Sequence, residues 1–552
     1  MLATETLRSA LALCVENLGW PWPAKTVVEP PRDPKHGDLS TNVALLLAKE
    51  LHKPPLELAK TLCQELQKTS KWVYQATAAA PGFCNVTFAP AFWQQVIPEI
   101  EEQGTHFGES EHGAEQKVLV EFVSANPTGP LHVGHGRGAA VGDSIARLLR
   151  KVGYNVETEY YINDAGRQMR LLGLSVWLRA RELQGLSVTF PEEYYKGSYI
   201  IDLAKALLEL EPNLCELEAS VAQDKCYAYA MEHIMAGIKA DLHNFRVEQD
   251  HFFSEKSLVE SQAVEQAFKT LDQAKLTYTK DQAYWFAAQQ FGDDHDRVLR
   301  KSDGSLTYFA SDIAYHHNKY NRGFTWLIDV WGADHHGYIP RMRAAVGAMG
   351  HAPESLDIVL IQLVNLLKDG KPLSMSTRAG TFETLADLIQ EVGCDAARFM
   401  FLSRKSDSPL DFDLDLVRLR NLDNPVYYVQ YAHARIHGVL RRAQEAKIRL
   451  AQSTPAVILE KLIDPDDLAL LQKIAQYPTV LINAARVLGV HHVSRYLLDI
   501  AGLVHSYYTK HQILGTDDAE LILARLALLR AVAQVIHNGL DILGVSAPTQ
   551  ML

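Results

Sequence analysis

The sequence predicts an α/β protein of several domains, built around a parallel β-sheet and ending in an all-α domain. A strand-like run over 118–123 precedes a glycine-rich turn, a helical pattern to about residue 151 and a second strand-like run over 155–161. This is the order of a βαβ unit, whose two strands run parallel. From about residue 425 the pattern is almost wholly helical, and 552 residues exceed what one hydrophobic core usually holds.

Residues 1–112 are predicted to form a small α/β domain, in which Phe83–Phe88 is a strand. The segment Gly108–Gln116 is polar and rich in turn residues, so it is expected to link this domain to the next. Residues 113–424 form the central α/β domain. Its sequence near 165–300 is acidic and helical and is expected to be inserted between the halves of the sheet, with further strands over 325–331 and 357–364.

Residues 425–552 are predicted to form the helical domain. They hold 12 Lys and Arg against 10 Asp and Glu, so the rest of the chain carries the negative excess of its net charge of −12. The net charge gives no support to a nucleic-acid partner, but a near-neutral helical tail is compatible with contacting a polyanion.

Composition excludes several other classes of protein. No window holds about 18 uninterrupted apolar residues, so no membrane span or membrane partner is expected. The N-terminus lacks the basic start of a secretory signal. Six cysteines are scattered without a CxxC pair. That spacing argues against a structural metal or a disulfide framework and fits a cytoplasmic location.

The glycine-rich turn, Ser124-Ala-Asn-Pro-Thr-Gly-Pro-Leu-His-Val-Gly-His-Gly-Arg-Gly, carries two histidines three residues apart. Backbone N–H groups at the start of a helix bind phosphate, and His132 and His135 on its first turn could stabilise charge as a phosphate chain is cleaved. The alternative is that both imidazoles cap or pack. A dinucleotide fingerprint is a second alternative. Its glycine spacing fails beyond Gly134-x-Gly136, although Glu157 or Glu159 could still serve a ribose.

Several motifs together resemble the arginyl-tRNA synthetase family. PLHVGH resembles the HIGH signature of class I aminoacyl-tRNA synthetases, and EFVSANPTGPLHVGH with VETEYYINDAGRQ resembles the arginyl family in particular. PPRDPKHGDLSTNVA near the start, DAARFMFLSRKSDSPLDFDLDL, NPVYYVQYAHARI and the ending GLDILGVSAPTQML are similar to further segments of that family. The resemblance therefore covers nearly the whole chain.

The resemblance implies a fold and a reaction. The fold is a Rossmann-type parallel-sheet catalytic domain, with an N-terminal α/β domain that contacts tRNA and a C-terminal all-α bundle that binds the anticodon. The reaction joins L-arginine to the 3′ end of tRNA(Arg), with ATP as substrate and Mg²⁺ accompanying ATP. It further implies transfer to the 2′-hydroxyl, a tRNA requirement for the first step, and a monomer.

Recognition of an arginine side chain requires carboxylates in fork geometry. The family's amino-acid pocket corresponds here to Glu121, Ser124, Asn126, His135, Tyr308 and Asp312. Tyr308 and Asp312 are four residues apart and so share a helix face. The alternative for Glu121 is a surface-facing strand residue paired with a lysine, and for Tyr308 it is core packing. The ATP site corresponds to Pro127, Leu131, His132, Gly134, His135, Asp334 and His335.

The loop Trp331–Arg341 follows a predicted strand, as a loop at the carboxyl edge of a sheet should. Taken alone, Asp334-His335-His336 could be metal ligands of a phosphoesterase. That hypothesis needs further aspartates at other strand ends, and Asp329 is the only near one. The resemblance instead places this loop beside the nucleotide and the amino acid, with no protein-bound metal.

The segment Asn365–Gly380 lies where class I synthetases carry the KMSKS loop, and here the pattern departs. In an alignment on Met375 and Ser376, the two signature lysines are replaced by Ser374 and Thr377. The nearest cations are Lys368 and Lys371. The predicted catalytic set is therefore His132, His135, Lys371, Met375 and Ser376, with Lys368 in reserve.

For the tRNA, the predicted contacts are Asn85 in the first domain and three tyrosines in the last: Tyr431, Tyr507 and Tyr508. Aromatic side chains stack on unpaired bases, and the alternative is that these rings pack helix against helix. Two rival functions come from other classes. An oxidoreductase would bind NAD(P) instead of ATP, and a silent relative would bind tRNA without turnover.

Overall fold

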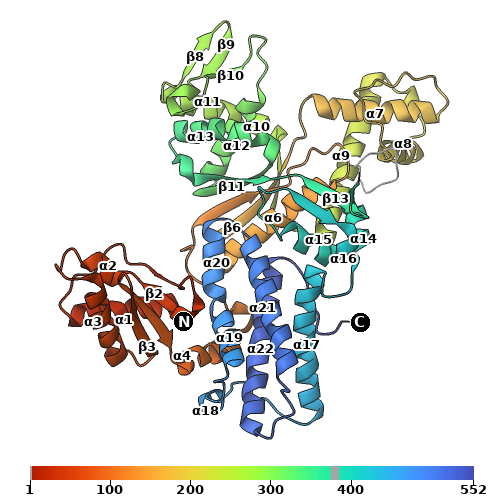
Figure 1. Cartoon of the computed structure of the whole chain (residues 1–552). Helices are drawn as coiled ribbons and strands as arrows, with labels where there is room; N and C mark the ends of the chain where they lie inside the picture. Colours follow the sequence, from red (N-terminus) through yellow and green to blue (C-terminus); the bar gives the residue numbers. More distant parts are fainter. Residues whose placement is uncertain (1–2, 374–383, 552) are drawn as a thin grey trace.

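The computed structural model describes residues 3–373 and 384–551. Figure 1 shows a small N-terminal α/β body (red), a central body with two projections, and a bundle of long helices (blue). The N-terminal body and the helical bundle lie side by side below the central sheet, and the two projections extend above it.

The N-terminal body is an antiparallel four-stranded sheet with the order β1-β2-β4-β3, packed against helices α1 and α3. Its elements are α1 (Ala3–Asn17), β1 (Val28–Glu29), β2 (Leu39–Thr41), α2 (Val43–Leu47), α3 (Pro55–Thr69), β3 (Val73–Ala79) and β4 (Phe83–Phe88). The predicted strand Phe83–Phe88 is confirmed as β4, and it lies between β2 and β3.

Two short helices, α4 (Pro90–Gln94) and α5 (Val96–Gln103), join this body to the helical bundle. Gln94 Nε2 donates to the carbonyl of Leu462 (3.1 Å), and Arg530 Nη2 donates to Glu101 Oε1 (2.5 Å). The first and last parts of the chain therefore contact each other directly, ahead of the polar segment that leads into the central sheet.

The central sheet has five strands in the order β12-β11-β5-β6-β7, and every pair is parallel. Its strands are β5 (Lys117–Glu121), β6 (Asn155–Ile162), β7 (His251–Ser254), β11 (Trp326–Gly332) and β12 (Leu356–Ile361). The predicted βαβ unit is confirmed, because α6 (Val133–Lys151) crosses from β5 to β6. The carboxyl ends of parallel strands meet at one edge, which is where ligands bind in such sheets.

The insertion between β6 and β7 is helical but ends earlier than the sequence predicts. It consists of α7 (Arg167–Leu183), α8 (Ser198–Leu210) and α9 (Ala219–Asn244), the arm at the upper right of Figure 1. The chain then returns to the sheet as β7, so residues beyond 244 do not belong to one helical insertion.

A second projection follows β7 and contains a three-stranded antiparallel sheet. It is built from α10 (Lys256–Glu260), α11 (Ala263–Gln273), β8 (Thr277–Lys280), β9 (Ala283–Phe286) and β10 (Arg297–Arg300). Thr-Tyr-Thr and Ala-Tyr-Trp-Phe are strand-forming runs, and the two residues between β8 and β9, Asp281 and Gln282, both have positive φ (49° and 60°). Two such residues form the tight turn that matches strand twist in a hairpin.

The helices α12 (Tyr308–Asn321) and α13 (Ile339–Ala348) pack against each other beside the sheet, and the short turn η5 (Ala333–Tyr338) joins β11 to α13. The predicted strand over 357–364 is divided. Its first part is β12, and its last residue begins β13 (Val364–Lys368), which pairs in a separate sheet. The β11–β12 ladder ends at the pair Gly332 and Ile361, and the N–H of the next residue, Gln362, donates to the carbonyl of Ser406 (2.9 Å).

This second sheet has the order β14-β13-β15 and is covered by short helices. The elements are β14 (Lys371–Pro372), α14 (Leu385–Val392), α15 (Cys394–Phe401), β15 (Leu410–Asp413) and α16 (Leu414–Arg418). The C-terminal bundle comprises α17 (Pro425–Glu445), α18 (Ala456–Leu459), α19 (Pro465–Ala475), α20 (Tyr477–Arg486), α21 (His491–Lys510) and α22 (Ala519–Ile542). Within the residues that the structure describes, no helix is long and apolar enough to cross a membrane.

Candidate active site

The glycine-rich turn places both histidines at the start of α6. His132 is the N-cap residue with extended backbone (φ −93°, ψ 167°), and His135 lies three residues into the helix. The backbone N–H of His132 donates to His135 Nδ1 (3.3 Å), and the two rings stack with centroids 3.5 Å apart. Because Nδ1 of a neutral His135 accepts this bond, its proton lies on Nε2, which remains a hydrogen-bond donor.

Both imidazoles are neutral at physiological pH. Burial lowers the pKa of His132, and burial together with the neighbouring His132 lowers the pKa of His135 from 6.5 to about 3. Burial disfavours the charged form of a base, and two bases in contact disfavour each other's protonation. The turn therefore offers a phosphate uncharged donors and the positive end of a helix dipole.

Two glycines of α6 allow its close packing. A Cβ at Gly142 would lie 2.2 Å from the ring of Phe122, and one at Gly136 would lie 2.6 Å from Leu385. The first glycine lets the helix approach the end of β5, and the second lets α14 approach the histidine turn. At Gly134, which is predicted to belong to the ATP site, a Cβ would meet only the ring of His132, at 3.0 Å.

The predicted carboxylate Glu121 ends β5 and is buried, with a buried cation beside it. Lys319 Nζ lies 2.6 Å from Glu121 Oε2 and 2.8 Å from Asp329 Oδ1, and the lysine is fully buried. Burial alone would lower the pKa of Lys319, but Asp329 and Glu121 together raise it above its usual value. Glu121 therefore pairs with a lysine, as the alternative predicts, but it does so in the interior rather than at the surface.

The turn after β5 fixes the orientation of Glu121. Val123 and Ser124 both have positive φ (70° and 40°), which is unfavourable for residues other than glycine and is found at functional sites. Ser124 Oγ donates to Glu121 Oε1 (2.8 Å) and accepts from the backbone N–H of Tyr161 (3.1 Å). Ser124 therefore holds Glu121 in place, while Asn126 is exposed two residues further along.

Asp312 lies on α12 in a different electrostatic setting. The hydroxyl of Tyr338 donates to Asp312 Oδ2, and burial raises the pKa of the carboxyl. Within the described part of the chain no cation lies within ion-pair distance of Asp312. Tyr308, one turn earlier on α12, is 76 % exposed, so it does not pack in the core.

Sequence reasoning missed Glu255, which follows β7. Burial and then the carboxylates of Glu255, Asp312, Glu121 and Asp164 raise the pKa of the Tyr161 hydroxyl, so these four acids lie near one tyrosine. Burial also raises the pKa of Glu255 itself, and Asp312 and Asp164 raise it further. Glu121, Asp312, Glu255 and Asp164 therefore form a negative cluster at the carboxyl edge of β5, β6 and β7, with the buried Lys319 bonded to Glu121.

Other predicted residues lie along the same edge. Pro127 and Leu131 are buried in the turn, and Asp334 and His335 are exposed in η5, with His335 Nε2 3.5 Å from Asp334 Oδ2. Within 3–373 and 384–551, the one group of side chains with metal-ligand spacing is Asp464, Asp466 and His511 in the helical bundle. The triplet Asp334-His335-His336 is not such a group, which removes the support for the phosphoesterase hypothesis.

The dinucleotide hypothesis also loses its ribose ligands. Glu159 is fully buried, accepts from Tyr315 Oη (2.7 Å) and forms a bidentate pair with Arg322 (2.6 and 2.7 Å). Glu157 Oε2 lies 2.6 Å from His251 Nε2. Both carboxylates are therefore already occupied.

Lys368 and Lys371 face each other in the β13–β14 hairpin and are exposed. Asp369 and Gly370 between them both have positive φ (52° and 68°), as a two-residue hairpin turn requires. The predicted residues Met375 and Ser376, with Ser374 and Thr377, lie outside the described residues. On the far side of that segment, Thr384 bridges to His132 and Leu385 N–H donates to the carbonyl of Leu131 (2.8 Å).

Arg137 is a second residue that sequence reasoning missed. It is fully buried on α6, just after the histidines, and donates to the carbonyls of Gln362 (2.9 Å), Ser408 (2.8 Å) and Lys405 (3.0 Å). These carbonyls lie beside the chain that enters β13 and β15. Arg137 thus fixes the histidine turn relative to the hairpin that carries Lys371.

The predicted tRNA contacts differ in accessibility. Tyr507 is buried and donates to Asp467 Oδ1 (2.6 Å), so it packs between helices as the alternative predicts. Asn85 is also buried within β4, which favours a role inside the sheet. Tyr431 and Tyr508 are half-buried, and the guanidinium of Arg435 lies over both rings, 4.5 and 4.6 Å from their centroids.

Three family models match consecutive parts of the chain. They are described as "Arginyl tRNA synthetase N terminal domain" (residues 3–88), "tRNA synthetases class I (R), catalytic domain" (residues 97–408) and "DALR anticodon binding domain" (residues 429–551). The catalytic model alone covers more than half of the chain. The order of the three models follows the three bodies seen in Figure 1.

Curated relatives match over the whole length. The chain is 63 % identical to an arginine–tRNA ligase of Desulfovibrio desulfuricans and 56 % identical to one of Nitratidesulfovibrio vulgaris, with 100 % of each chain covered. The solved structure of Thermus thermophilus arginyl-tRNA synthetase is 22 % identical and superposes with a TM-score of 0.74 over 100 % of both chains, which shows the same fold. The chain therefore belongs to the arginyl-tRNA synthetase family of class I.

Proposed function

We propose that this protein is an arginyl-tRNA synthetase in activity as well as in family. A carboxylate oxygen of L-arginine attacks the α-phosphorus of ATP, the bond to the β-phosphate oxygen breaks, and pyrophosphate leaves. The 2′-hydroxyl of the terminal tRNA ribose then attacks the carbonyl carbon of the arginyl-adenylate, and AMP leaves with the electron pair of the broken anhydride bond. ATP is a substrate of the class I family, and bound tRNA is required for the first step.

The observation that carries this proposal is the negative cluster beside the turn with two neutral histidines. Asp312 and Glu255 lie without a cation at ion-pair distance among the described residues, next to Tyr161, whereas Glu121 is shared with Lys319. A guanidinium supplies the missing positive charge and can bond two carboxylates through its fork of donors. Glu121 with Asn126 is then placed for the α-amino group, and Tyr308 for the rim of the pocket.

At the nucleotide end, His135 Nε2–H and His132 donate to the phosphates as charge develops on them. Neutral donors aimed at developing charge favour the transition state without binding a proton. Lys371 supplies the mobile cation that the altered KMSKS segment lacks, and Met375 and Ser376 are proposed to act from that segment. Pro127, Leu131, Gly134, Asp334 and His335 complete the ATP site.

Mg²⁺ is proposed to arrive with ATP and to neutralise charge on the leaving pyrophosphate. Mg²⁺ usually keeps several waters and is held by substrate phosphates with one or two carboxylates. The carboxylate–histidine group in the bundle is not a competing site, because Lys510 Nζ already lies 2.8 Å from Asp466 Oδ1. We also propose that the protein is a monomer and that it is cytoplasmic. The six free cysteines support the cytoplasmic location.

For the tRNA, we propose that the N-terminal domain and the helical domain contact it. Tyr508 and Tyr431 with Arg435 form the base-stacking surface of the helical domain. Stacking of one base on an aromatic ring is worth about 1–3 kcal/mol, so Tyr508→Ala should raise the KM for tRNA by roughly 5- to 160-fold. The melting temperature should stay near that of the wild type. Tyr507→Ala is the matched variant, and it should lower the melting temperature because it removes a buried ring and its bond to Asp467.

Aminoacylation of total tRNA with each of the twenty labelled amino acids tests the main proposal. We expect arginine alone to become acid-precipitable, and only with ATP present. Binding of NAD(P) with no use of ATP would support an oxidoreductase instead. Binding of tRNA with no charging by any amino acid would support a silent relative.

A further inference from the structure

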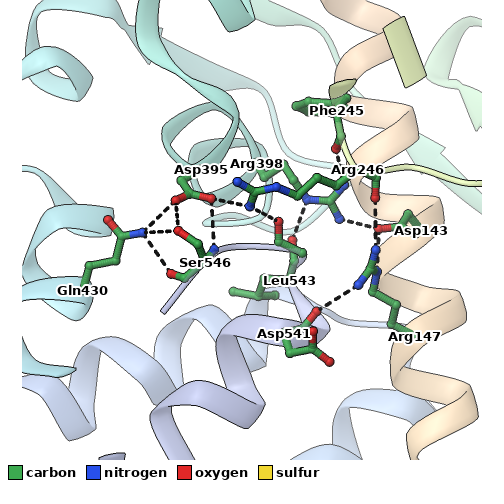
Figure 2. A network of polar contacts seen from close by, with 11 residues as sticks. Asp143, Arg147, Phe245, Arg246, Asp395, Arg398, Gln430, Asp541, Leu543 and Ser546 are labelled. Atoms are coloured by element: carbon green, nitrogen blue, oxygen red, sulfur yellow. Dashed lines mark hydrogen bonds and ion pairs between the residues drawn. The ribbon is translucent and has the colours of Figure 1, made fainter. Parts of the chain in front are cut away.

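Leu543 and Ser546, which follow the last helix of the helical domain, contact Arg398 and Asp395 of the catalytic domain, as Figure 2 shows. We propose that Arg398 is a positioning residue that clamps the segment 543–546 against α6, so that tRNA bound on the helical domain acts on the histidine turn through this clamp. This inference rests on the proposed function and adds to it a route between two parts of one substrate's site.

Arg398 on α15 is fully buried and bonds three distant segments. Its Nε donates to the carbonyl of Leu543 (2.7 Å), its Nη1 to the carbonyl of Phe245 (2.9 Å), and its Nη2 to Asp143 Oδ2 (2.5 Å). Asp143 is on α6, and Phe245 directly follows α9. One guanidinium therefore joins the histidine-bearing helix, the helical insertion and the end of the bundle.

The backbone of the C-terminal segment is shaped to this guanidinium. Gly544 has φ +64°, and a Cβ there would lie 2.5 Å from the guanidinium carbon of Arg398. Arg246 Nη1 donates to the carbonyl of Gly544 (3.0 Å) and to Asp395 Oδ1 (2.5 Å). Only a glycine fits this turn with both arginines in place.

Ser546, two residues after Gly544, is bonded both to the catalytic domain and to the bundle. Asp395 accepts from the backbone N–H of Ser546 (3.0 Å) and from its hydroxyl, and Gln430 Nε2 donates both to Asp395 Oδ2 and to the carbonyl of Ser546 (2.9 Å each). Gln430 is on α17, one residue before Tyr431. The clamp is therefore continuous with the helix that carries the proposed base-stacking surface.

The segment then follows α17 outward. His433 Nδ1 lies 2.8 Å from the carbonyl of Pro548, and Arg441 Nη1 donates to the carbonyl of Thr549 (2.9 Å). We call residues 543–549 the strap. A change in α17 on tRNA binding acts on the strap along its length, and the inner end of the strap, at Leu543, is bonded to Arg398.

On the catalytic side, α6 transmits the position of Asp143 to His132. The helix is buried along most of its length, and Arg137 bonds it to the carbonyls near the Lys371 hairpin. A shift of α6 at Asp143 therefore moves the histidine turn and its partners together. Coupling between two sites through such an element typically changes affinity or rate by about 5- to 150-fold.

Ser546→Ala is the decisive variant, because it removes one hydroxyl at the clamp and leaves every charged group in place. Ser494→Ala is its matched control. Ser494 Oγ also joins the bundle to the catalytic domain, donating from α21 to the carbonyl of Leu402 (2.9 Å), but it lies outside the strap. Arg398→Lys is a second, stronger variant, and melting curves report whether each protein folds.

Each protein is assayed for arginylation of tRNA(Arg) and of the same tRNA with one anticodon base substituted. We expect Ser546→Ala to lower kcat about 10-fold on the normal tRNA with little change in the KM for tRNA. We also expect the kcat loss from the anticodon substitution to shrink several-fold in this variant, whereas the control keeps the wild-type loss. Such non-additivity measures coupling between the two sites.

If the two losses simply multiply in Ser546→Ala, the clamp only stabilises the fold and the proposal is overturned. It is overturned equally if kcat of the wild-type enzyme is indifferent to the anticodon. Absence of arginylation by the wild-type enzyme on any tRNA would instead refute the proposed function, so the two failures are distinct.

Discussion

The two ends of the candidate site, one proposed for the amino acid and the other for the nucleotide, hold their charges in different ways. At the amino-acid end, Lys319 is locked between Glu121 and Asp329 in the interior, and Asp312 lies close by without a cation of its own among the described residues. At the nucleotide end, His132 and His135 are neutral, and Lys368 and Lys371 stand exposed on a turn. If Asp312 binds the guanidinium as proposed, negative charge for arginine is in place before the substrate arrives, whereas the cation proposed for the phosphates is an exposed lysine.

The largest expected effect tests whether the buried ion pairs hold the amino-acid end together. Lys319→Met leaves Glu121 and Asp329 buried without their cation, and breaking a buried pair in this way costs about 3–5 kcal/mol. We expect the free energy of unfolding, measured with denaturant, to fall by that amount. Lys368→Met is the matched control on the exposed hairpin and should leave it unchanged. Equal stability of the two variants would mean that Lys319 is not essential to the pocket.

A second substitution compares the free carboxylate with its neighbour. Asp312→Asn removes the charge that faces the guanidinium, and losing one partner of a buried charged pair costs about 2–5 kcal/mol, or roughly 30- to 5000-fold in kcat/KM for arginine. Tyr338→Phe keeps the carboxylate and removes only the hydroxyl that bonds it, so its loss should be about 10-fold. Near-normal kcat/KM in Asp312→Asn would mean that the guanidinium binds elsewhere.

At the nucleotide end, Lys371 is predicted to speed adenylate formation by stabilising the charge that develops on the leaving pyrophosphate. Lys371→Ala should slow arginine-dependent pyrophosphate exchange, measured with tRNA present, on the order of 10²-fold, the scale for one lost stabilising donor. ATP binding in the ground state should change far less. Lys368→Ala is the comparison, and a larger loss there would transfer the role to Lys368.

The smallest effect concerns protonation of the histidine turn. Because burial lowers the pKa of His135 to about 3, the folded protein resists a proton that the unfolded chain accepts near pH 6.5. This contribution to stability is complete above pH 6.5 and is lost as the pH falls from 6.5 toward 3. In an NMR titration of the histidine ring carbons, with His135→Asn to assign the signal, the His135 resonance should not move between pH 8 and 5. Movement near pH 6.5 would contradict a neutral, half-buried donor.

The parts of the fold that were predictable are those with a local signal. The strand, the glycine turn and α6 follow from periodicity and from glycines that the close packing of Phe122 and Leu385 requires. The β8–β9 hairpin also has a local signal, in the run Thr-Tyr-Thr-Lys-Asp-Gln-Ala-Tyr-Trp-Phe. The predicted helical insertion, near 165–300, wrongly includes this hairpin, because the helical pattern before it is strong. Helix α21 has another local signal. Ile500, Val504 and Tyr507 recur at spacings of four and three, which places Tyr507 on the buried stripe and Tyr508 beside it.

Residues defined by distant partners gave no such signal. Lys319 looks like any helix lysine until Glu121, 198 residues earlier, is brought against it. Arg137 is one more polar residue in a glycine-rich stretch, and only the fold supplies the carbonyls near residues 362 and 408. Glu255 lies just after a strand that the sequence did not reveal, so its place beside Asp312 and Tyr161 could not be anticipated.

The contact between Arg398 and Leu543 has a consequence for synthesis of the protein. The two residues are 145 positions apart, and domains fold in order as the chain leaves the ribosome. Until Leu543 has been translated, the guanidinium of Arg398 therefore lacks one of its hydrogen-bond acceptors. A nascent chain that stalls inside the bundle would hold a catalytic domain in which Arg398, beside α6, is not bonded to the C-terminal segment.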